Sequence, residues 1–259
     1  MTTTEIAFDR KPVFDALREL FGGLSQPQVD TIDDAIDRSL GLVDAARPQI
    51  GLTDADFAAV AKQLGCSVAQ IRAVWEVESG GGWFTDVRAD ILAADGPGGF
   101  LDGPHLPKIL FEAHIFDRET GGRFRTGHPK LSSSRWDKKL YVGGQAEYLR
   151  LNRAMRLDRN AALRSASVGG AQIMGFNHKL AGFDTIEQFW EAMKTSERAH
   201  LDAFAAFIRS NNLTAALRQI SPMHAACVAF ARGYNGKGYA ANEYHIKIAR
   251  AFAKYQNAA

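Results

Sequence analysis

Long apolar runs are missing from this chain of 259 residues, although 46% of its residues are hydrophobic and 23% are charged. No stretch approaches the roughly 20 apolar residues that a membrane-spanning helix needs, so we expect no stable insertion into a membrane. The first residues, MTTTEIAFDRK, lack the basic start and the apolar segment of a signal peptide. We therefore expect a globular protein that is made in a cytoplasm and is not exported by a conventional signal.

Cysteine is scarce as well, with Cys66 and Cys227 far apart in apolar helical patterns. We predict two buried thiols, because this spacing resembles neither a disulfide framework nor a zinc knuckle. The seven histidines form no H-E-x-x-H motif, and the sequence has no glycine-rich phosphate loop or G-x-S-x-G nucleophile turn. RNA-recognition and zinc-finger motifs are also missing. The sequence therefore predicts no metal, no cofactor and no nucleic-acid partner.

The net charge of +2 hides an uneven distribution. Residues 1–50 carry nine acidic and five basic residues, whereas the rest of the chain carries 20 acidic and 26 basic residues. A mildly basic main part suits an anionic polymer such as cell wall or nucleic acid, although so small an excess is common. Near the C-terminus, Lys247, Arg250 and Lys254 follow one edge of a predicted helix. We expect this helix to pack on the domain with its basic edge in solvent; a membrane-active helix is the alternative.

The apolar pattern divides the chain into two parts near residue 50. In residues 1–50 it predicts two short helices around a Gly-Gly turn, the first over Pro12–Phe21. Ser25 and Gln28 form a capping box that opens the second helix. Residues 51–259 form the predicted main domain.

The main domain is expected to be mostly helical. Residues 80–108 are rich in glycine and proline and residues 121–142 are polar, so both are predicted to be irregular. Residues 109–116 fit either a helix or a strand. The predicted fold class is therefore mostly α, with a small irregular or β-containing lobe. Helical spacing is found at Asp54–Leu64, in a segment opened by Ser67, and at 144–154, 158–165, 186–194, 197–210, 213–220, 223–233 and 239–258.

The helix opened by Ser67 ends in Trp75-Glu76-Val77-Glu78-Ser79, followed by three glycines. A carboxylate at a half-buried helix end that faces a glycine-rich opening can have a raised pKa and act as a general acid. The alternative is a solvated Glu in an ordinary helix C-terminus. Glu76 lies two residues earlier, about 200° around the helix, and cannot face the same side as Glu78.

Two further segments have the composition of a binding site. Residues 165–178, SASVGGAQIMGFNH, combine small residues with amide groups and apolar surface, a mixture that suits a sugar. A glycine-rich helix junction is the alternative. In the second segment, an apolar helix runs into Tyr234-Asn235-Gly236. Asn-Gly alone indicates only a turn, but Tyr234 and Asn235 at a helix end are placed to face a polar cleft.

Taken together, these motifs resemble the N-acetylmuramidase domain of bacteriophage and prophage endolysins. The resemblance covers roughly residues 52–256, and the motif order is also similar to goose-type lysozymes and lytic transglycosylases. The motifs are V-E-S-G (77–80), S-A-S-x-G-x-x-Q-I-M-G-F-N (165–177) and A-R-G-Y-N-G (231–236), with the family-like elements G-F-L-D-G (99–103), I-L-F-E-A-H-I-F (109–116) and L-D-A-F (201–204).

The resemblance implies a lysozyme-like helical fold and hydrolysis of the β-1,4 bond from N-acetylmuramic acid to N-acetylglucosamine in peptidoglycan, causing bacterial lysis. Glu78 is then the general acid. Glu112 is the first choice for the second carboxylate, and Asp102 is the second choice.

The alternatives are a lytic transglycosylase with 1,6-anhydro products and a non-catalytic peptidoglycan-binding protein. An amidase or peptidase is disfavoured, because the sequence lacks a set of zinc ligands and a catalytic Cys/His pair. The expected substrate contacts are Gln172, Met174, Asn177, Tyr234 and Asn235.

Two departures from the family pattern stand out. Trp83–Gly98 looks like an insertion beside Glu78, and Ala113 occupies a position where the family commonly has Arg. Residues 1–50 are expected either to bind the wall or to pack on the catalytic domain, and their negative charge argues against direct binding to an anionic polymer. We expect a monomer that reaches the cell wall after release through the inner membrane.

Overall fold

The computed structural model describes residues 10–24, 28–29, 32–33, 36, 51–79, 83–85 and 106–256. Three predictions lie wholly or largely outside the described residues: the Ser25 capping box, Asp102 in its G-F-L-D-G element, and most of the Trp83–Gly98 insertion.

In the N-terminal part, helix α1 (Lys11–Phe21) begins one residue before the predicted start. Pro12 occupies the first turn, and the helix ends at Gly22, whose φ of 73° suits glycine. Phe14 packs with Leu24 and Val29 in a small apolar cluster that shares no residue with the core of the main domain.

Capping boxes begin the first two helices of the main domain. Helix α3 (Asp54–Leu64) starts at Thr53, whose side chain exchanges hydrogen bonds with Asp56. Helix α4 (Val68–Ser79) starts at Ser67, whose hydroxyl accepts from the Gln70 amide at 3.1 Å while the Gln70 side chain accepts from Ser67 N. Both starts agree with the sequence prediction, because caps depend only on neighbouring residues.

Two small antiparallel sheets are present in the described part of the chain. Strand β1 (Phe84–Thr85) pairs with β2 (Leu106–Pro107), and β3 (Ile109–Phe111) pairs with β4 (Ala166–Val168), which pairs with β5 (Ile173–Met174). The interpretation of residues 165–178 as a helix junction is therefore wrong, since the segment is a hairpin. Residues 109–116, which fit either a helix or a strand in the sequence, contain strand β3 and then the beginning of helix α6 (Ala113–Glu119).

The remaining elements are helical. The last helix begins at Tyr244 rather than at Tyr239, because a 3-10 turn and a positive φ of 54° at Glu243 precede it. In chain order the elements are η1 (Lys138–Leu140), α7 (Ala146–Leu157), α8 (Arg159–Arg164), η2 (Gly175–Asn177), α9 (Ile186–Thr195), α10 (Glu197–Ser210), α11 (Thr214–Arg218), α12 (His224–Asn235), η3 (Gly236–Tyr239) and α13 (Tyr244–Gln256).

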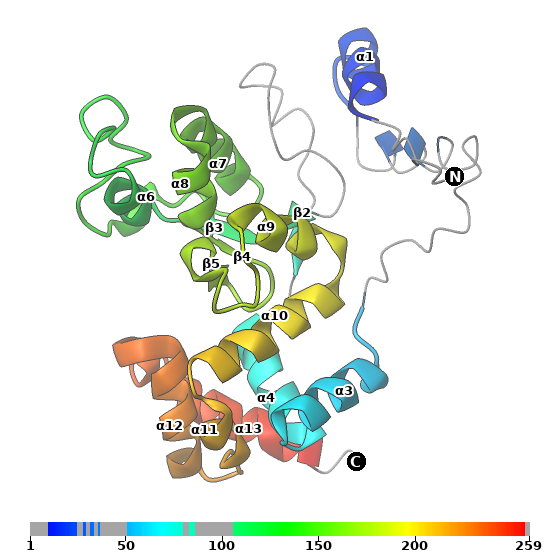
Figure 1. Ribbon diagram of the computed structural model, residues 1–259, viewed down its shortest axis with the longest axis vertical. Coiled ribbons are helices and arrows are strands. Elements are labelled where there is room, and N and C mark those ends of the chain that lie inside the picture. The colour runs from blue at the N-terminus through cyan, green and yellow to red at the C-terminus, as the bar shows by residue number, and fades with distance from the viewer. Residues whose placement is uncertain are drawn as a thin grey trace.

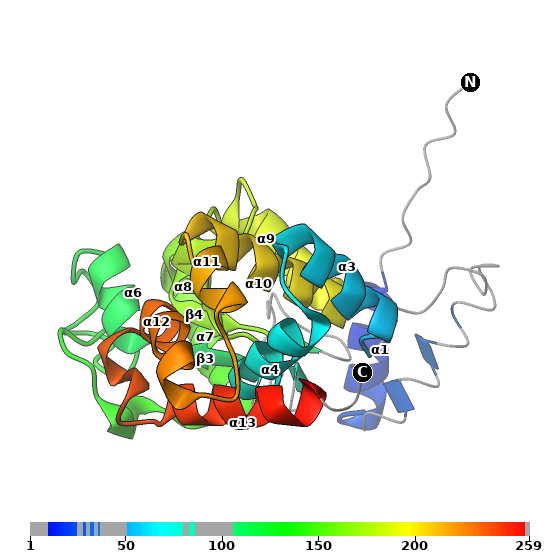
Figure 2. The same cartoon turned by 90° about the horizontal axis from the view of Figure 1, so that it is seen from below.

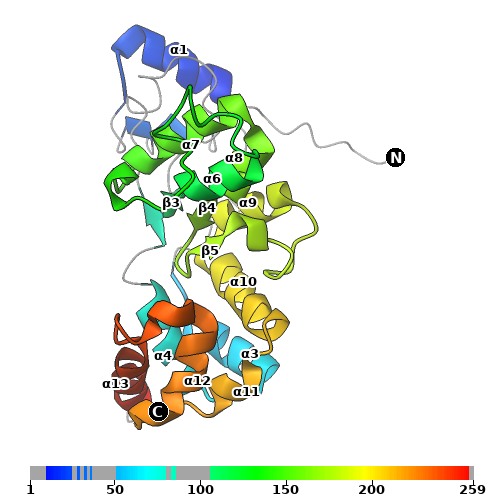
Figure 3. The same ribbon diagram turned by 90° about the vertical axis from the view of Figure 1, so that its left-hand side faces the viewer.

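The main domain has two lobes (Figure 1). One holds the three-stranded sheet with α6 to α9, the other holds α3, α4 and α11 to α13, and α10 runs between them (Figure 3). Helix α13 packs along α4 (Figure 2), as predicted for the C-terminal helix. One continuous apolar core serves both lobes, so the fold is mostly helical with a small β-containing lobe, as expected.

Two smaller predictions can be compared with this fold. Cys227 is buried as predicted, whereas Cys66 is partly exposed; both thiols are free. None of the helices described is both long and apolar enough to span a membrane.

Candidate active site

Glu78 lies in the last turn of α4, and its carboxylate meets the end of α12. The Asn235 side-chain amide donates a hydrogen bond to Glu78 Oε1 at 2.9 Å. Burial raises the pKa of Glu78 to about 7, and the Asn235 hydrogen bond opposes this rise. At neutral pH a large fraction of the Glu78 carboxyl groups therefore carries a proton, which is the state that a general acid needs.

Tyr234 precedes Asn235 and connects α12 to the sheet. Its ring packs edge-on against Phe204 and stacks on Phe230. Its hydroxyl donates to the carbonyl oxygen of Ala171, in the turn between β4 and β5, at 3.1 Å. The hydroxyl of Tyr234, an expected substrate contact, thus has a partner inside the protein, and this bond holds the hairpin turn beside the Glu78–Asn235 pair.

Gln172 forms the corner of this hairpin turn, with a positive φ of 48°. Its Oε1 accepts from the Ser167 hydroxyl at 2.8 Å. Its Nε2 donates to the Gly169 carbonyl at 2.7 Å and to the Lys108 carbonyl at 3.2 Å. Both amide hydrogens are therefore bonded to backbone carbonyls, one in the turn and one just before β3, so Gln172 stabilises the turn.

Two tryptophans join the end of α4 to the same hairpin. The rings of Trp75 and Trp83 lie 4.0 Å apart. Trp83 in turn packs against Gly170, where an added Cβ would come within 2.3 Å of the indole ring. The apolar surroundings of the α4 end thus include Trp83, a residue that the sequence placed only at the edge of an insertion.

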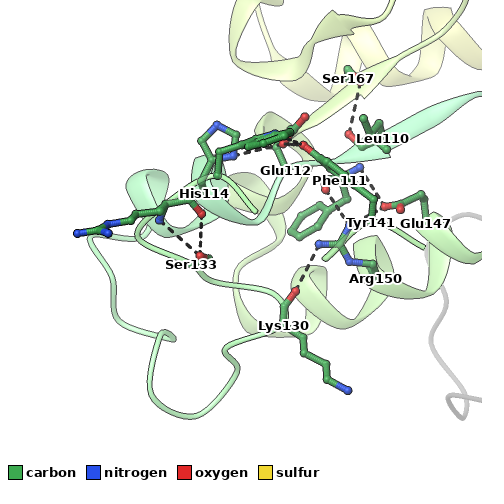
Figure 4. A network of polar contacts seen from close by, with 12 residues as sticks. Leu110, Phe111, Glu112, His114, Lys130, Ser133, Tyr141, Glu147, Arg150 and Ser167 are labelled. Carbon is green, nitrogen blue, oxygen red and sulfur yellow. Dashed lines mark hydrogen bonds and ion pairs between the residues drawn. The ribbon is translucent and has the colours of Figure 1, made fainter. Parts of the chain in front are cut away.

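Glu112 lies directly after β3, at the N-terminus of α6. Its Oε2 accepts from the Tyr141 hydroxyl at 2.6 Å and lies 3.2 Å from His114 Nδ1. Tyr141 comes from the irregular segment before α7, and its hydroxyl also accepts from the Trp136 indole N–H at 2.7 Å. Figure 4 shows Glu112, His114 and Tyr141 together at this end of the sheet.

A buried carboxylate, Glu147, fixes the backbone on both sides of the Glu112–Tyr141 pair (Figure 4). It accepts from the amides of Phe111, Val142 and Gly143 at 3.2, 2.8 and 3.0 Å. Arg150 donates to Glu147 at 2.7 Å and to the Phe111 carbonyl at 2.9 Å. Arg150 thus places a cation beside the end of β3, close in sequence to Ala113.

The strand register separates the two carboxylates. Ile109 pairs with Val168 near the hairpin turn, and Phe111 pairs with Ala166 at the other end of the sheet. Glu78 meets the turn end through Asn235 and Tyr234, whereas Glu112 follows the opposite end of β3. Two other predicted contacts, Met174 at the end of β5 and Asn177 in η2, are partly exposed, and neither side chain is among those seen to bond Glu78 or Glu112 in the described residues.

Tyr141, Trp136 and Glu147 could not be found from the sequence, because they belong to no recognised motif. Tyr244, at the start of α13, belongs to no motif either; burial, and to a lesser degree the charge of Glu78, raises the pKa of Tyr244. Over residues 51–79, 83–85 and 106–256, no three His, Cys, Asp or Glu side chains gather as a metal site requires.

Comparison with known proteins identifies a family and a related solved structure. The N-acetylmuramidase family model matches residues 67–256. Among solved structures, the crystal structure of Burkholderia AP3 phage endolysin is similar, with a TM-score of 0.67 and 36% sequence identity. The match covers 83% of this chain and 76% of that chain. No curated protein matches.

Proposed function

This chain belongs to the N-acetylmuramidase family, and we propose that it is an endolysin that hydrolyses the β-1,4 bond from N-acetylmuramic acid to N-acetylglucosamine, with Glu78 as the general acid. One observation carries the proposal. The carboxyl of Glu78, with a pKa near 7, lies where three motifs from distant parts of the sequence meet. V-E-S-G supplies Glu78, A-R-G-Y-N-G supplies Asn235, and Tyr234 binds the hairpin that contains Gln172.

The chemistry follows from the contacts of the Glu78 carboxyl. Asn235 donates to Oε1, so that oxygen acts as the acceptor and the acidic proton resides on Oε2. Glu78 passes this proton to the leaving glycosidic oxygen as the bond breaks. Negative charge then develops on the carboxylate, and the fixed Asn235 donor stabilises it more strongly than the neutral acid.

Glu112 is the proposed second carboxylate, acting on water or on the developing positive charge of the sugar. Its support is the Tyr141 hydroxyl, which donates at 2.6 Å and orients the charged oxygen. Asp102 remains the other proposed candidate. Gln172, Met174, Asn177, Tyr234 and Asn235 remain proposed substrate contacts, with Gln172 and Tyr234 acting mainly through the turn that they hold.

Analysis of digestion products tests this proposed reaction. Purified sacculi treated with the protein should release muropeptides that end in reducing N-acetylmuramic acid. The alternative transglycosylase reaction gives 1,6-anhydro ends, which are lighter by one water, and mass spectrometry separates the two. Anhydro products as the main species, or binding without release of reducing sugar, would contradict the proposed hydrolysis.

Changing Asn235 to Ala should shift the pH dependence of activity. The Asn235 hydrogen bond lowers the pKa of Glu78, so its loss raises that pKa and moves the alkaline decline of kcat/KM to higher pH. Because a hydrogen bond to a charged group contributes about 1.5–3 kcal/mol, kcat/KM at its maximum should fall roughly 10- to 100-fold.

Asn242→Ala is the matched control for this change. The Asn242 amide donates to the Gly238 carbonyl in an exposed turn between η3 and α13, and its loss should leave the pH profile unchanged. An Asn235→Ala profile that coincides with that of the wild type would contradict the proposed role of Asn235.

The remaining proposals concern how the protein works in the cell. We propose a monomer that acts on peptidoglycan strands in the periplasm after release through the inner membrane. Residues 1–50 are proposed to be a separate helical hairpin and residues 51–259 the catalytic domain. The separate apolar cluster around Phe14 supports this division.

A further inference from the structure

Trp136 is an exposed tryptophan beside the proposed second carboxylate. Its side chain is 60% exposed, and Val142, six residues later, is 59% exposed. The two flank Tyr141, whose hydroxyl binds Glu112. An indole ring carries a large apolar face that water solvates poorly, so its exposure at this position favours a role in binding.

The position of Trp136 is fixed although its ring is exposed. The indole N–H donates to the Tyr141 hydroxyl at 2.7 Å, and the two ring centroids lie 6.3 Å apart. The backbone after Tyr141 is held by Glu147, and the backbone before Trp136 is held by the Ser133 amide, which donates to the Ala113 carbonyl at 3.2 Å. A ring that is already ordered loses little conformational entropy when a ligand binds.

We propose that Trp136 is a sugar-binding platform, which stacks on the apolar face of one pyranose ring of the glycan strand. The proposal rests on the proposed function, because it places that ring on the Glu112 side of the active site. A pyranose has C–H groups on its faces and hydroxyl groups at its edge, and a flat aromatic face with a polar rim complements this arrangement. His114, partly exposed beside Glu112, supplies a hydrogen-bonding group at the same end of the sheet.

The location of Trp136 predicts which kinetic constant depends on it. Trp136 reaches Glu112 only through the Tyr141 hydroxyl, which accepts from the indole N–H and donates to the carboxylate. We therefore place the ring that stacks on Trp136 next to the ring on which Glu112 acts, and not at the bond that Glu78 cleaves. A contact remote from the reacting atoms has the same strength in the ground state and in the transition state. Its loss therefore changes KM rather than kcat.

Binding to purified sacculi tests the platform in a Glu78→Gln protein, which should not digest the probe. Trp136→Ala in this background should weaken co-sedimentation with sacculi about fivefold to tenfold, whereas Trp136→Phe, which keeps an aromatic face, should stay within about threefold. In the active protein, Trp136→Ala should raise KM with little change in kcat. Met223→Ala removes another exposed apolar side chain, 69% exposed at the start of α12, and should change neither the binding to sacculi nor KM.

The substitutions at Trp136 and Met223 should each leave the melting temperature of their own background, Glu78→Gln or wild type, unchanged. Equal binding by Trp136→Ala and the Glu78→Gln parent would overturn the platform, and so would a Trp136→Phe protein as weak as Trp136→Ala, since the indole N–H would then matter instead of the ring face. Absence of binding by the Glu78→Gln parent would overturn it as well. If the parent binds through Trp136 while the wild type releases no reducing sugar, the proposed function fails and the platform remains.

Discussion

Replacing Glu78 with Gln should reduce lysis by about 10²- to 10⁴-fold, the contribution that a positioned acid typically makes. Gln keeps the size of the side chain and the oxygen that accepts from Asn235, but it has no acidic proton to give to the leaving sugar. The loss of turbidity of permeabilised Gram-negative cells measures the effect. A Glu78→Gln protein that keeps more than about a tenth of the activity would show that another group protonates the leaving oxygen.

Glu76→Gln is the matched control on the same helix. The Glu76 carboxylate accepts from Lys254 Nζ at 2.6 Å and from Tyr255, on the side of α4 that faces α13. We expect this variant to keep nearly full activity, because Glu76 lies about 200° around the helix from Glu78.

Stability provides a second check on the Glu78→Gln protein. Burial raises the pKa of Glu78 from its ordinary value of 4.5 to about 7. The unfolded chain therefore releases this proton at a lower pH than the folded chain, and the wild type loses stability as the pH rises from about 4.5 to 7. The Gln side chain does not titrate, so the variant should lack this loss and be more stable than the wild type above pH 7.

Replacing Glu147 with Ala should lower the free energy of unfolding by about 3–5 kcal/mol, since it leaves the charge of Arg150 buried without its partner. Glu147 is fully buried, and Arg150 is 6% exposed. The change also removes the acceptor for three backbone amides at Phe111, Val142 and Gly143. Urea denaturation measures the difference. Such a loss is a large part of the 5–15 kcal/mol that typically stabilises a domain.

An exposed ion pair provides the control for this change. Glu191 binds Lys194 within α9, and its side chain is 70% exposed. Glu191→Ala should cost at most about 1 kcal/mol, as is usual for solvated pairs. If Glu147→Ala costs no more than Glu191→Ala, then Glu147 does not brace the Glu112–Tyr141 pair in the way that the contacts indicate.

The sequence predicted those parts of the fold that depend on local interactions. The starts of α3 and α4 follow from Thr53 and Ser67, because a cap and its partner lie three residues apart. The hairpin of β4 and β5 could not be predicted in this way. Its strands have three and two residues, too few to show an alternating pattern. Its neighbour β3 lies far back in the chain, since Ile109 pairs with Val168.

The same distinction applies to the active site. Glu78 could be found because a carboxylate at a helix end before glycines is visible in the sequence. The internal bonds of Gln172 and Tyr234 could not, since a sequence does not show whether a polar side chain faces a ligand or a backbone carbonyl. Tyr141 and Glu147 were missed for a related reason: they come from an irregular segment and a helix that only tertiary packing brings to Glu112.

The proposed role of Glu78 as the general acid requires a raised pKa. A ¹³C NMR titration of protein labelled at glutamate carboxyl carbons measures it, with the Glu78→Gln protein identifying the signal. We expect a midpoint near pH 7, as burial at the end of α4 raises the pKa of this group to about 7. A midpoint at or below the ordinary value of 4.5 would mean that Glu78 is ionised at neutral pH, and it would contradict its assignment as the general acid.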